Sequence, residues 1–313
     1  MTLSYKIIAN PVAGRGAGNL FIPQIEQTLK KNGLDFQLTR TEHPMHARDL
    51  AIQAVRDGFK VVVATGGDGT CNEVLNGLME AQKMGIGEAC MAVLCVGRGN
   101  DFAFGMGIPT RLEDGLTTLM SGSRRRIDVG FVKGGLFPEG RYFGNGVGIG
   151  FDAMVGFVSA KMTRLSGFAS YIVAALKTIS LYYNAPLVKI EYDGQELVQP
   201  SLMISVMNGR RMGGGFLMAP HSMPDDNQLD LCVVHQMSRL AILWTIPSFF
   251  KGSQADRPNI WTGRARQISV TALQGSLPAH ADGETLCTEG SQLIMNTSPY
   301  QLDLIFNAEK GAV

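Results

Sequence analysis

The sequence lacks the short motifs that most often mark phosphate, zinc and protein-kinase sites. It contains no Walker A motif GxxxxGK[ST], no HExxH, no HRD catalytic loop and no cysteine and histidine cluster at metal-ligand spacing. These absences exclude the P-loop, zincin and protein-kinase classes. Any phosphate or metal chemistry must therefore come from another arrangement of residues.

Other absences bear on location and partners. The five cysteines are odd in number and form no CxxC pair, which favours a reduced interior. The first residues lead into a strand pattern without the apolar core of a signal peptide. A net charge of +1 leaves no broad basic field for nucleic acid. We therefore expect a cytoplasmic protein that does not bind nucleic acid.

Long apolar runs are also missing. The longest, residues 171–183 and 240–250, are interrupted by Lys177 and Pro247 and are too short to span a bilayer. Any membrane contact is therefore expected to be peripheral and transient, at the inner membrane surface.

Glycine, with 38 residues, and methionine, with 16, are abundant, and the 313 residues are enough for about two domains. From Tyr5 to about Met120, apolar runs alternate with helical patterns, which predicts a parallel α/β sheet. After Arg126 the pattern becomes β-rich, with a helical insertion near residues 152–183. The final apolar strand, residues 302–306, suits either domain. The expected domains are residues 1–126, completed by 299–313, and residues 127–298.

Three predicted strands end in loops rich in ligand-type residues, at residues 10–16, 65–70 and 97–101. Ligands of open α/β sheets bind at the carboxyl ends of strands, so these loops are expected to converge. In the second loop, Gly66, Gly67 and Gly69 are expected to take positive φ and let a phosphate approach closely. Asp68 would repel that phosphate unless Mg²⁺ or a hydroxyl lies between them. A tight turn with an aspartate cap is the alternative.

Beyond that loop, a series of motifs spans nearly the whole chain and resembles the diacylglycerol kinase catalytic family, which includes sphingosine and ceramide kinases. The short chain is similar in length to the soluble bacterial enzymes of that family. The resemblance implies an N-terminal sheet like that of NAD kinase and phosphofructokinase, followed by a β-rich, sandwich-like domain. The motifs are NPVAG at 10–14, TEHPMHA at 41–47, GGDGTCNEV at 66–74, GRGNDFA at 97–103, GIGFDA at 148–153, GGGF at 213–216, DDNQLD at 225–230 and DGE at 282–284.

The resemblance also implies a nucleotide site built from the first loops. Backbone amides and small hydroxyls can hold phosphates without a Walker lysine. Arg98 departs from the family, where a threonine is usual, and would either clamp a phosphate or crowd it. Taken alone, Asn10-Pro11 suits a strand-ending turn, and His46 suits a cap of its helix or of its partner loop. The implied nucleotide residues are Asn10, Pro11, Val12, Ala13, Gly14, Thr41, Gly66, Gly67, Asp68, Gly69, Thr70, Cys71, Asn72, Glu73 and Arg98.

For catalysis, an acceptor hydroxyl must lose its proton as it attacks the γ-phosphoryl group, which calls for a carboxylate. The resemblance places this proton acceptor at Glu284, with Asp282 as a rival, while Asp68 orients ATP and its metal. A hairpin turn at Asp282-Gly283 is the structural alternative.

Two magnesium sites are expected. One Mg²⁺ arrives with ATP near Asp68. The resemblance implies a second, held by the Asp226 side chain and the carbonyls of Met223 and Gln228, because hard oxygen ligands suit Mg²⁺. An acidic turn is the alternative for this loop.

The lipid-facing surface is expected within residues 151–183, whose apolar and basic side chains suit an interfacial helix pair or a core-facing helix. The basic run at residues 124–126 suits a solvated linker or a contact with anionic headgroups.

The sequence as a whole predicts an ATP-dependent lipid kinase. It would bind nucleotide in the first domain and lipid in the second, and transfer the γ-phosphate to a hydroxyl of a membrane lipid such as diacylglycerol, giving phosphatidic acid. The expected partners are ATP and a membrane lipid, and a homodimer is also expected. One alternative is NAD kinase, which shares GGDGT, although Asn72 and Glu73 follow that motif more closely here. The other is a non-catalytic lipid- or nucleotide-binding regulator.

Overall fold

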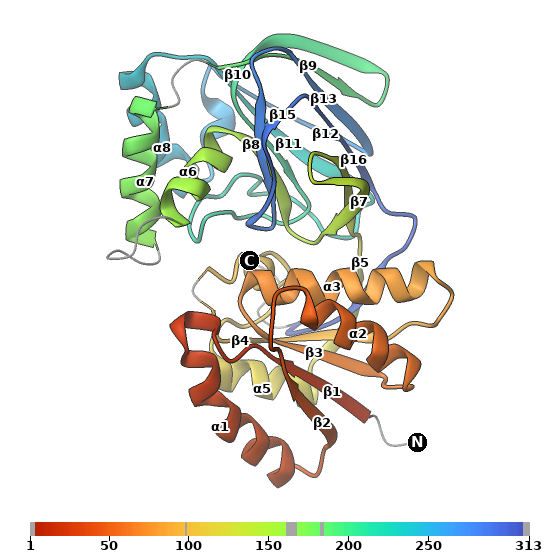
Figure 1. Ribbon diagram of the computed structural model, residues 1–313. Helices are drawn as coiled ribbons and strands as arrows, with labels where there is room; N and C mark the ends of the chain where they lie inside the picture. Colours follow the sequence, from red (N-terminus) through yellow and green to blue (C-terminus); the bar gives the residue numbers. More distant parts are fainter. Residues whose placement is uncertain (1–3, 98, 161–167, 182–184, 309–313) are drawn as a thin grey trace. The chain divides into compact units, whose positions relative to one another are not determined.

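The structure, a computed structural model, describes residues 4–97, 99–160, 168–181 and 185–308 (Figure 1). These residues form two compact units. The first contains the described residues up to Val129 together with those from Pro299 onward, and the second runs from Gly130 to Ser298.

The first unit is built on a six-stranded sheet in the order β2-β1-β3-β4-β17-β5. All neighbouring strands are parallel except β17 and β5, so the predicted parallel α/β sheet is confirmed. β3 is buried along its whole length, as expected of a central parallel strand covered on both faces. The strands are β1 (Ser4–Ala9), β2 (Asp35–Arg40), β3 (Val61–Gly66), β4 (Cys90–Cys95), β5 (Ser123–Ile127) and β17 (Leu302–Phe306).

Helices cover both faces of this sheet. Ile25 and Leu29 of α1 and Leu116 of α5 share a buried cluster with β-strand residues such as Val63. α2 and α3 pack against each other on the other face (Figure 1). The helices are η1 (Ala13–Arg15), α1 (Ala17–Lys31), α2 (His46–Arg56), α3 (Asp68–Lys83), α4 (Asp101–Gly105) and α5 (Leu112–Ser121).

The last strand of the chain, β17, lies in this first sheet between β4 and β5. The basic run at residues 124–126 belongs to β5, so the predicted linker is wrong. β5 pairs with β17 along its length, and Arg126 donates to Asp303 at 2.8 Å. A charged edge strand of this kind also discourages pairing with another chain.

The second unit is dominated by antiparallel strands, which confirms the predicted β-rich, sandwich-like domain. The strands are β6 (Gly130–Gly134), β7 (Phe137–Phe143), β8 (Gly146–Gly150), β9 (Leu187–Tyr192), β10 (Gln195–Met207), β11 (Leu229–His235), β12 (Ile260–Ala265), β13 (Gln267–Gln274), β14 (Leu277–Ala281), β15 (Glu284–Gly290) and β16 (Gln292–Thr297).

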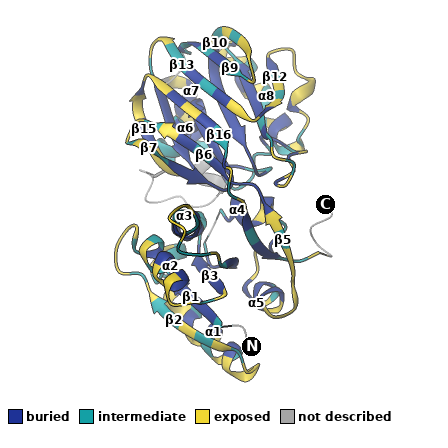
Figure 2. Ribbon diagram, turned by 90° about the vertical axis from the view of Figure 1, so that its right-hand side faces the viewer, coloured by how far each residue is buried: buried dark blue, intermediate teal, exposed yellow. Residues whose placement is uncertain are grey.

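The long strand β10 joins the two layers of this unit. Its first half pairs with β9, and after an irregularity between Ser201 and Met203 its second half pairs with β8 and β11. The sheet can therefore fold over a common core, which appears as buried strand segments in Figure 2.

A second core forms where β10 and β11 meet three helices. The predicted helical insertion is present as α6 (Phe151–Ala160) and α7 (Phe168–Leu181). α8 (Arg239–Lys251) and the short η2 (Gln254–Asp256) follow β11. The expected interfacial residues Lys161, Met162, Arg164 and Leu165 lie outside the described residues.

Candidate active site

Three loops meet where β1, β3 and β4 end. The Asn10 N–H donates to the Thr65 carbonyl at 2.9 Å, and the Val96 and Gly97 N–H groups donate to the Gly66 carbonyl at 3.0 and 3.1 Å. These strands are neighbours in the sheet, so their carboxyl ends bring the predicted loops together.

The glycines of these loops serve close packing between loops. A Cβ built on Gly97 would lie 2.4 Å from the Cα of Gly67, and one built on Gly14 would lie 2.4 Å from the Val96 carbonyl oxygen. Contrary to expectation, none of Gly66, Gly67 and Gly69 has a positive φ. The tight approach of two backbones, rather than a left-handed conformation, explains the glycine at position 67, and at Gly66 an added Cβ would instead meet the Thr70 side chain.

Asp68 is the first residue of α3, so the helix begins earlier than the sequence suggested. The N–H groups of the first helical turn project from the helix end, where they attract anions. The Asp68 Oδ1 accepts the Phe102 N–H at 3.0 Å, so this carboxylate also caps α4. Burial, together with the Asp68 charge, raises the pKa of the nearby Cys95 thiol to about 12.

Asn10 and Thr70 connect two of the loops. The Asn10 Nδ2 donates to the Thr70 Oγ1 at 3.0 Å, while its Oδ1 accepts the Val12 N–H at 3.1 Å. Thr41 follows β2 and donates its N–H to the Ala9 carbonyl at 2.9 Å. The structure thus brings Asn10, Thr41 and residues 66–70 to one edge of the sheet. Arg98 lies outside the described residues.

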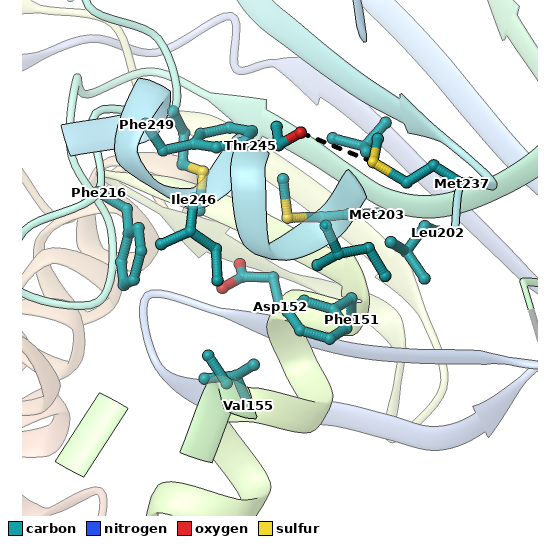
Figure 3. A pocket seen from close by; sticks show the side chains of 14 residues that line it. Phe151, Asp152, Val155, Leu202, Met203, Phe216, Met237, Thr245, Ile246 and Phe249 are labelled. Carbon is teal, nitrogen blue, oxygen red and sulfur yellow. Dashed lines mark hydrogen bonds between the residues drawn. The ribbon is translucent and has the colours of Figure 1, made fainter. Parts of the chain in front are cut away.

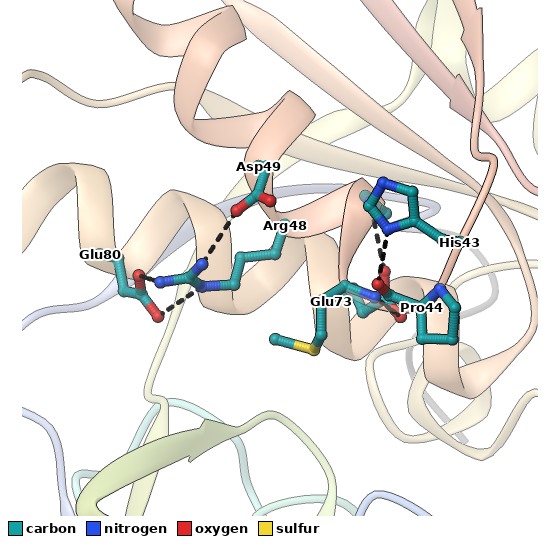
Figure 4. Close-up of polar contacts among 8 residues, drawn as sticks. His43, Pro44, Arg48, Asp49, Glu73 and Glu80 are labelled. Carbon is teal, nitrogen blue, oxygen red and sulfur yellow. Dashed lines mark hydrogen bonds and ion pairs between the residues drawn. The ribbon is translucent and has the colours of Figure 1, made fainter.

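Asn72 and Glu73 face other parts of the unit. Asn72 is buried and its Oδ1 accepts the Asn76 Nδ2 at 3.1 Å, one helical turn on. Glu73 accepts the Met45 N–H at 2.9 Å and the Ala47 N–H at 3.1 Å, at the start of α2 (Figure 4). Glu73 therefore holds the loop that follows Thr41.

Arg48 reinforces the same junction. Its Nε donates to the Glu80 Oε1 at 2.9 Å and its guanidinium also pairs with Asp49 at 2.9 Å (Figure 4). The contact with Glu80 fastens α2 to α3, while Asp49 lies beside Arg48 on α2. His46 does not cap α2 but the loop before it, because its Nδ1 accepts the Glu42 N–H at 3.1 Å.

In the second unit, Asp282 and Gly283 form a two-residue turn between β14 and β15, with φ of 50° and 87°. The Asp282 carboxylate is buried and accepts three backbone N–H groups, from Gly144 at 2.8 Å, Asn145 at 3.0 Å and Gly146 at 2.8 Å. Glu284, by contrast, is exposed at the first position of β15. The two candidate proton acceptors therefore differ in environment: the Asp282 carboxylate is buried and hydrogen-bonded, whereas Glu284 is exposed.

A buried histidine connects this turn to a carboxylate on α6. The His280 Nδ1 accepts the Gly283 N–H at 3.2 Å, and its Nε2 lies 3.2 Å from the Asp152 Oδ2. Space for the pair depends on Gly148, because a Cβ there would lie 2.1 Å from the Asp152 Oδ2. The sequence predicts no role for Asp152, although its motif GIGFDA is part of the family resemblance.

Asp152 lies in an otherwise largely apolar pocket bounded by α6, α7, α8, β10 and β11 (Figure 3). Thr245 is the other polar side chain, and its hydroxyl donates to the Ala241 carbonyl at 2.7 Å. The lining residues are Phe151, Asp152, Val155, Ala175, Leu202, Met203, Phe216, Met218, Val234, Met237, Ile242, Thr245, Ile246 and Phe249.

The predicted metal loop is a tight turn. The Asp226 Oδ1 accepts the Gln228 N–H at 3.1 Å, and Asn227 has a positive φ of 56°. The Asp226 Oδ2 lies 3.6 Å from the Arg264 Nη1, so a cation already faces it. Among the described residues no cluster of three histidine, cysteine or acidic side chains is arranged to hold a metal ion.

Comparison with known proteins agrees with these observations. Residues 4–132 match the diacylglycerol kinase catalytic domain, and residues 145–306 match the YegS C-terminal NAD kinase beta sandwich-like domain. Fold, loops and family matches define a lipid kinase that uses ATP as co-substrate. The chain belongs to the diacylglycerol kinase catalytic-domain family, as its motifs had indicated.

Individual proteins show the same likeness. The chain is 28% identical to a diacylglycerol kinase of Mycobacterium tuberculosis over 282 residues, covering 90% of this chain and 88% of that protein. A crystal structure of a diacylglycerol kinase from Bacillus anthracis superposes with a TM-score of 0.73 at 21% identity, over 98% of each chain.

An NAD kinase from Archaeoglobus fulgidus, solved in complex with ATP, gives a TM-score of 0.55 at 14% identity, over 98% of this chain and 95% of that one. This likeness concerns the fold alone. Because the family match identifies a lipid kinase, the NAD kinase and non-catalytic alternatives are set aside.

Within the described part of the chain, no helix is long and apolar enough to cross a membrane.

Proposed function

We propose that the lipid substrate is diacylglycerol and that the product is phosphatidic acid. The observation that carries the proposal is the His280 bridge, which ties the carboxylate of the apolar pocket to the turn that bears Glu284. An apolar pocket with one charged group suits a lipid that has acyl chains and a single free hydroxyl. We assign the acyl chains to the apolar lining and the hydroxyl end to Asp152.

Glu284 is the proposed proton acceptor, because Asp282 already accepts three backbone N–H groups. The hydroxyl oxygen of the lipid forms a bond to the γ-phosphorus while the bond from that phosphorus to the β,γ-bridging oxygen breaks. ADP leaves with the bridging oxygen, and the hydroxyl proton passes to the Glu284 carboxylate.

The nucleotide site is proposed at the joined loops of the first unit. The N–H groups at the start of α3 would bind phosphate oxygens, with Asn10, residues 11–14 and Thr41 around them. Cys71 and Asn72 are buried in α3, so we assign them to supporting the site. Glu73 positions the Thr41 loop through the Met45 and Ala47 N–H groups.

Mg²⁺ is proposed to accompany ATP at Asp68 and Asp101. A Cβ built on Gly99 would lie 2.8 Å from the Asp68 Oδ2 and 3.8 Å from the Asp101 Oδ2, so the two carboxylates flank this glycine. Such hard oxygen donors suit Mg²⁺, which when bound offsets the negative charge of the phosphates.

A second Mg²⁺ at Met223, Asp226 and Gln228 stays a prediction. Arg264 already supplies positive charge to Asp226 at 3.6 Å and also contacts Asp230 at 3.1 Å. A metal at this site would need the guanidinium to turn away from Asp226 toward Asp230. Cytoplasmic location, peripheral contact with the inner membrane surface and a homodimer likewise stay predictions.

A labelling assay tests the substrate. The protein is incubated with ATP labelled at the γ-phosphate, Mg²⁺ and a total lipid extract, and the labelled lipid is identified by mass spectrometry. We expect phosphatidic acid. Label in a different phospholipid would overturn diacylglycerol as the substrate while leaving the lipid kinase assignment intact.

A further inference from the structure

We propose that α8 is the helix by which this kinase docks on an anionic phospholipid bilayer. The outward side chains of α8 are unusually apolar: Trp244 is 77% exposed, Leu240 70% and Leu243 39%. Exposed tryptophan and leucine on one helix are typical of proteins that insert side chains into the headgroup region. The sequence pointed instead to residues 151–183, where α6 contributes buried residues such as Phe151 and Val155.

The two faces of α8 have different tasks. At 100° per residue, Leu240, Leu243 and Trp244 lie within one third of the helix circumference. Ile242, Ile246 and Phe249 lie on the opposite side, where they line the pocket (Figure 3). The exposed face therefore lies one helix thickness from the proposed acyl site, on the other side of α8.

Charge favours an anionic bilayer over a second copy of the chain. α8 carries Arg239 and Lys251, both exposed, and no carboxylate. α7, whose Ala175 lines the same pocket, adds exposed Lys177 and Leu176 and also has no carboxylate. Cations beside apolar side chains complement anionic headgroups and the acyl boundary. The nearest following carboxylate is Asp256, in η2.

The proposal rests on the membrane-lipid substrate, because a kinase with a soluble substrate has no need of a bilayer. The assays therefore separate docking from chemistry. Docking is measured on vesicles of equal parts phosphatidylglycerol and phosphatidylcholine, without diacylglycerol. Activity is measured on diacylglycerol dispersed in detergent micelles, where no bilayer is needed.

The first test uses the two tryptophans of the chain. Trp261→Phe leaves Trp244 as the reporter, and vesicles should shift its emission to shorter wavelength and allow quenching by brominated lipids. Trp244→Phe leaves Trp261, which packs against Tyr192 with ring centroids 5.0 Å apart and should show neither effect. Equal responses from the two variants, or no response from Trp244, would overturn the proposal.

The second test uses Leu240→Ser with Trp244→Ser, against Leu273→Ser on β13, which is 49% exposed and outside the pocket. The double variant should lose about tenfold or more in vesicle partitioning, while the control partitions like the wild type. Micellar activity should be unchanged in both. Wild-type partitioning of the double variant would contradict the proposal. So would a result in which the wild type and the control are dimers and the double variant is a monomer, because α8 would then be a dimer interface.

Discussion

The His280 Nε2 lies 3.2 Å from the Asp152 Oδ2, while the opposite ring nitrogen accepts the Gly283 N–H. Because Nδ1 is an acceptor, the network places the ring proton on Nε2, where it is donated to Asp152. One buried imidazole thus connects the carboxylate of the apolar pocket with the turn that carries Glu284. A change at either end is expected to affect how the lipid hydroxyl is held.

Asp152→Asn keeps the size of the side chain but removes its charge, which should weaken binding of the lipid hydroxyl. We expect the KM for diacylglycerol in micelles to rise about tenfold and the KM for ATP to stay unchanged. Thr245→Val is the matched control, because the Thr245 hydroxyl donates to the Ala241 carbonyl within its own helix. Steady-state kinetics with each substrate varied provides the measurement. Equal lipid KM values for Asp152→Asn and the wild type would refute the assignment.

Asp282→Asn should act on stability. Asparagine tolerates the positive φ of 50° at this position, but its amide cannot accept all three backbone N–H groups. The free energy of unfolding is expected to fall by about 2 to 3 kcal/mol. Urea denaturation measures it, and Glu284→Gln, on the exposed neighbour, should leave the midpoint unchanged. A wild-type midpoint for Asp282→Asn would mean that the turn does not depend on this carboxylate.

Glu73→Gln tests whether this residue positions the Thr41 loop. The glutamine oxygen can accept one N–H, whereas Glu73 accepts those of both Met45 and Ala47. We expect faster hydrogen exchange at residues 45–47 and a KM for ATP raised about three- to tenfold, with a smaller change in kcat. Glu113→Gln, on an exposed position of α5, is the control. A raised KM with unchanged exchange would instead point to direct contact with the nucleotide.

Buried thiols predict a loss of stability at alkaline pH. Burial raises the pKa of Cys95 and Cys232 from 9.0 to about 12 and that of Cys90 to about 11. Above pH 9 the unfolded chain releases these protons while the native state keeps them, so stability falls as pH rises from 9 toward 12. The slope is about 1.4 kcal/mol per pH unit for each thiol.

The matched variant for this effect is Cys232→Ala, which removes one thiol from the second core. Urea denaturation at pH 8 and at pH 10 should show a smaller pH-dependent loss in the variant than in the wild type. Identical losses would indicate that Cys232 ionises equally in the folded and unfolded states.

The α/β architecture could be predicted because buried parallel strands leave a strong pattern in sequence. β3 is apolar along most of its length and passes directly into a glycine turn, and neighbouring strands repeat the plan. Convergence of their loops then follows from the parallel topology. The reason for glycine at positions 67 and 97 could not be predicted from the sequence, because the contact between these two residues is visible only in three dimensions.

The second unit was harder to predict in its functional details. Asp152 and His280 are 128 residues apart, and nothing local to either residue indicates that they meet. In the first unit, the orientation of Glu73 toward α2, and not toward the phosphate loops, likewise depends on how two helices pack. In each case the role of the side chain is set by a partner that sequence spacing does not reveal.

The most direct test of the account compares Glu284→Gln with the wild type in the transfer of labelled γ-phosphate from ATP to diacylglycerol micelles. We predict labelled phosphatidic acid from the wild type. For the variant we predict a kcat reduced by about a hundredfold or more, with an unchanged unfolding midpoint. Wild-type kcat in Glu284→Gln would contradict the proposed proton acceptor and, with it, the mechanism.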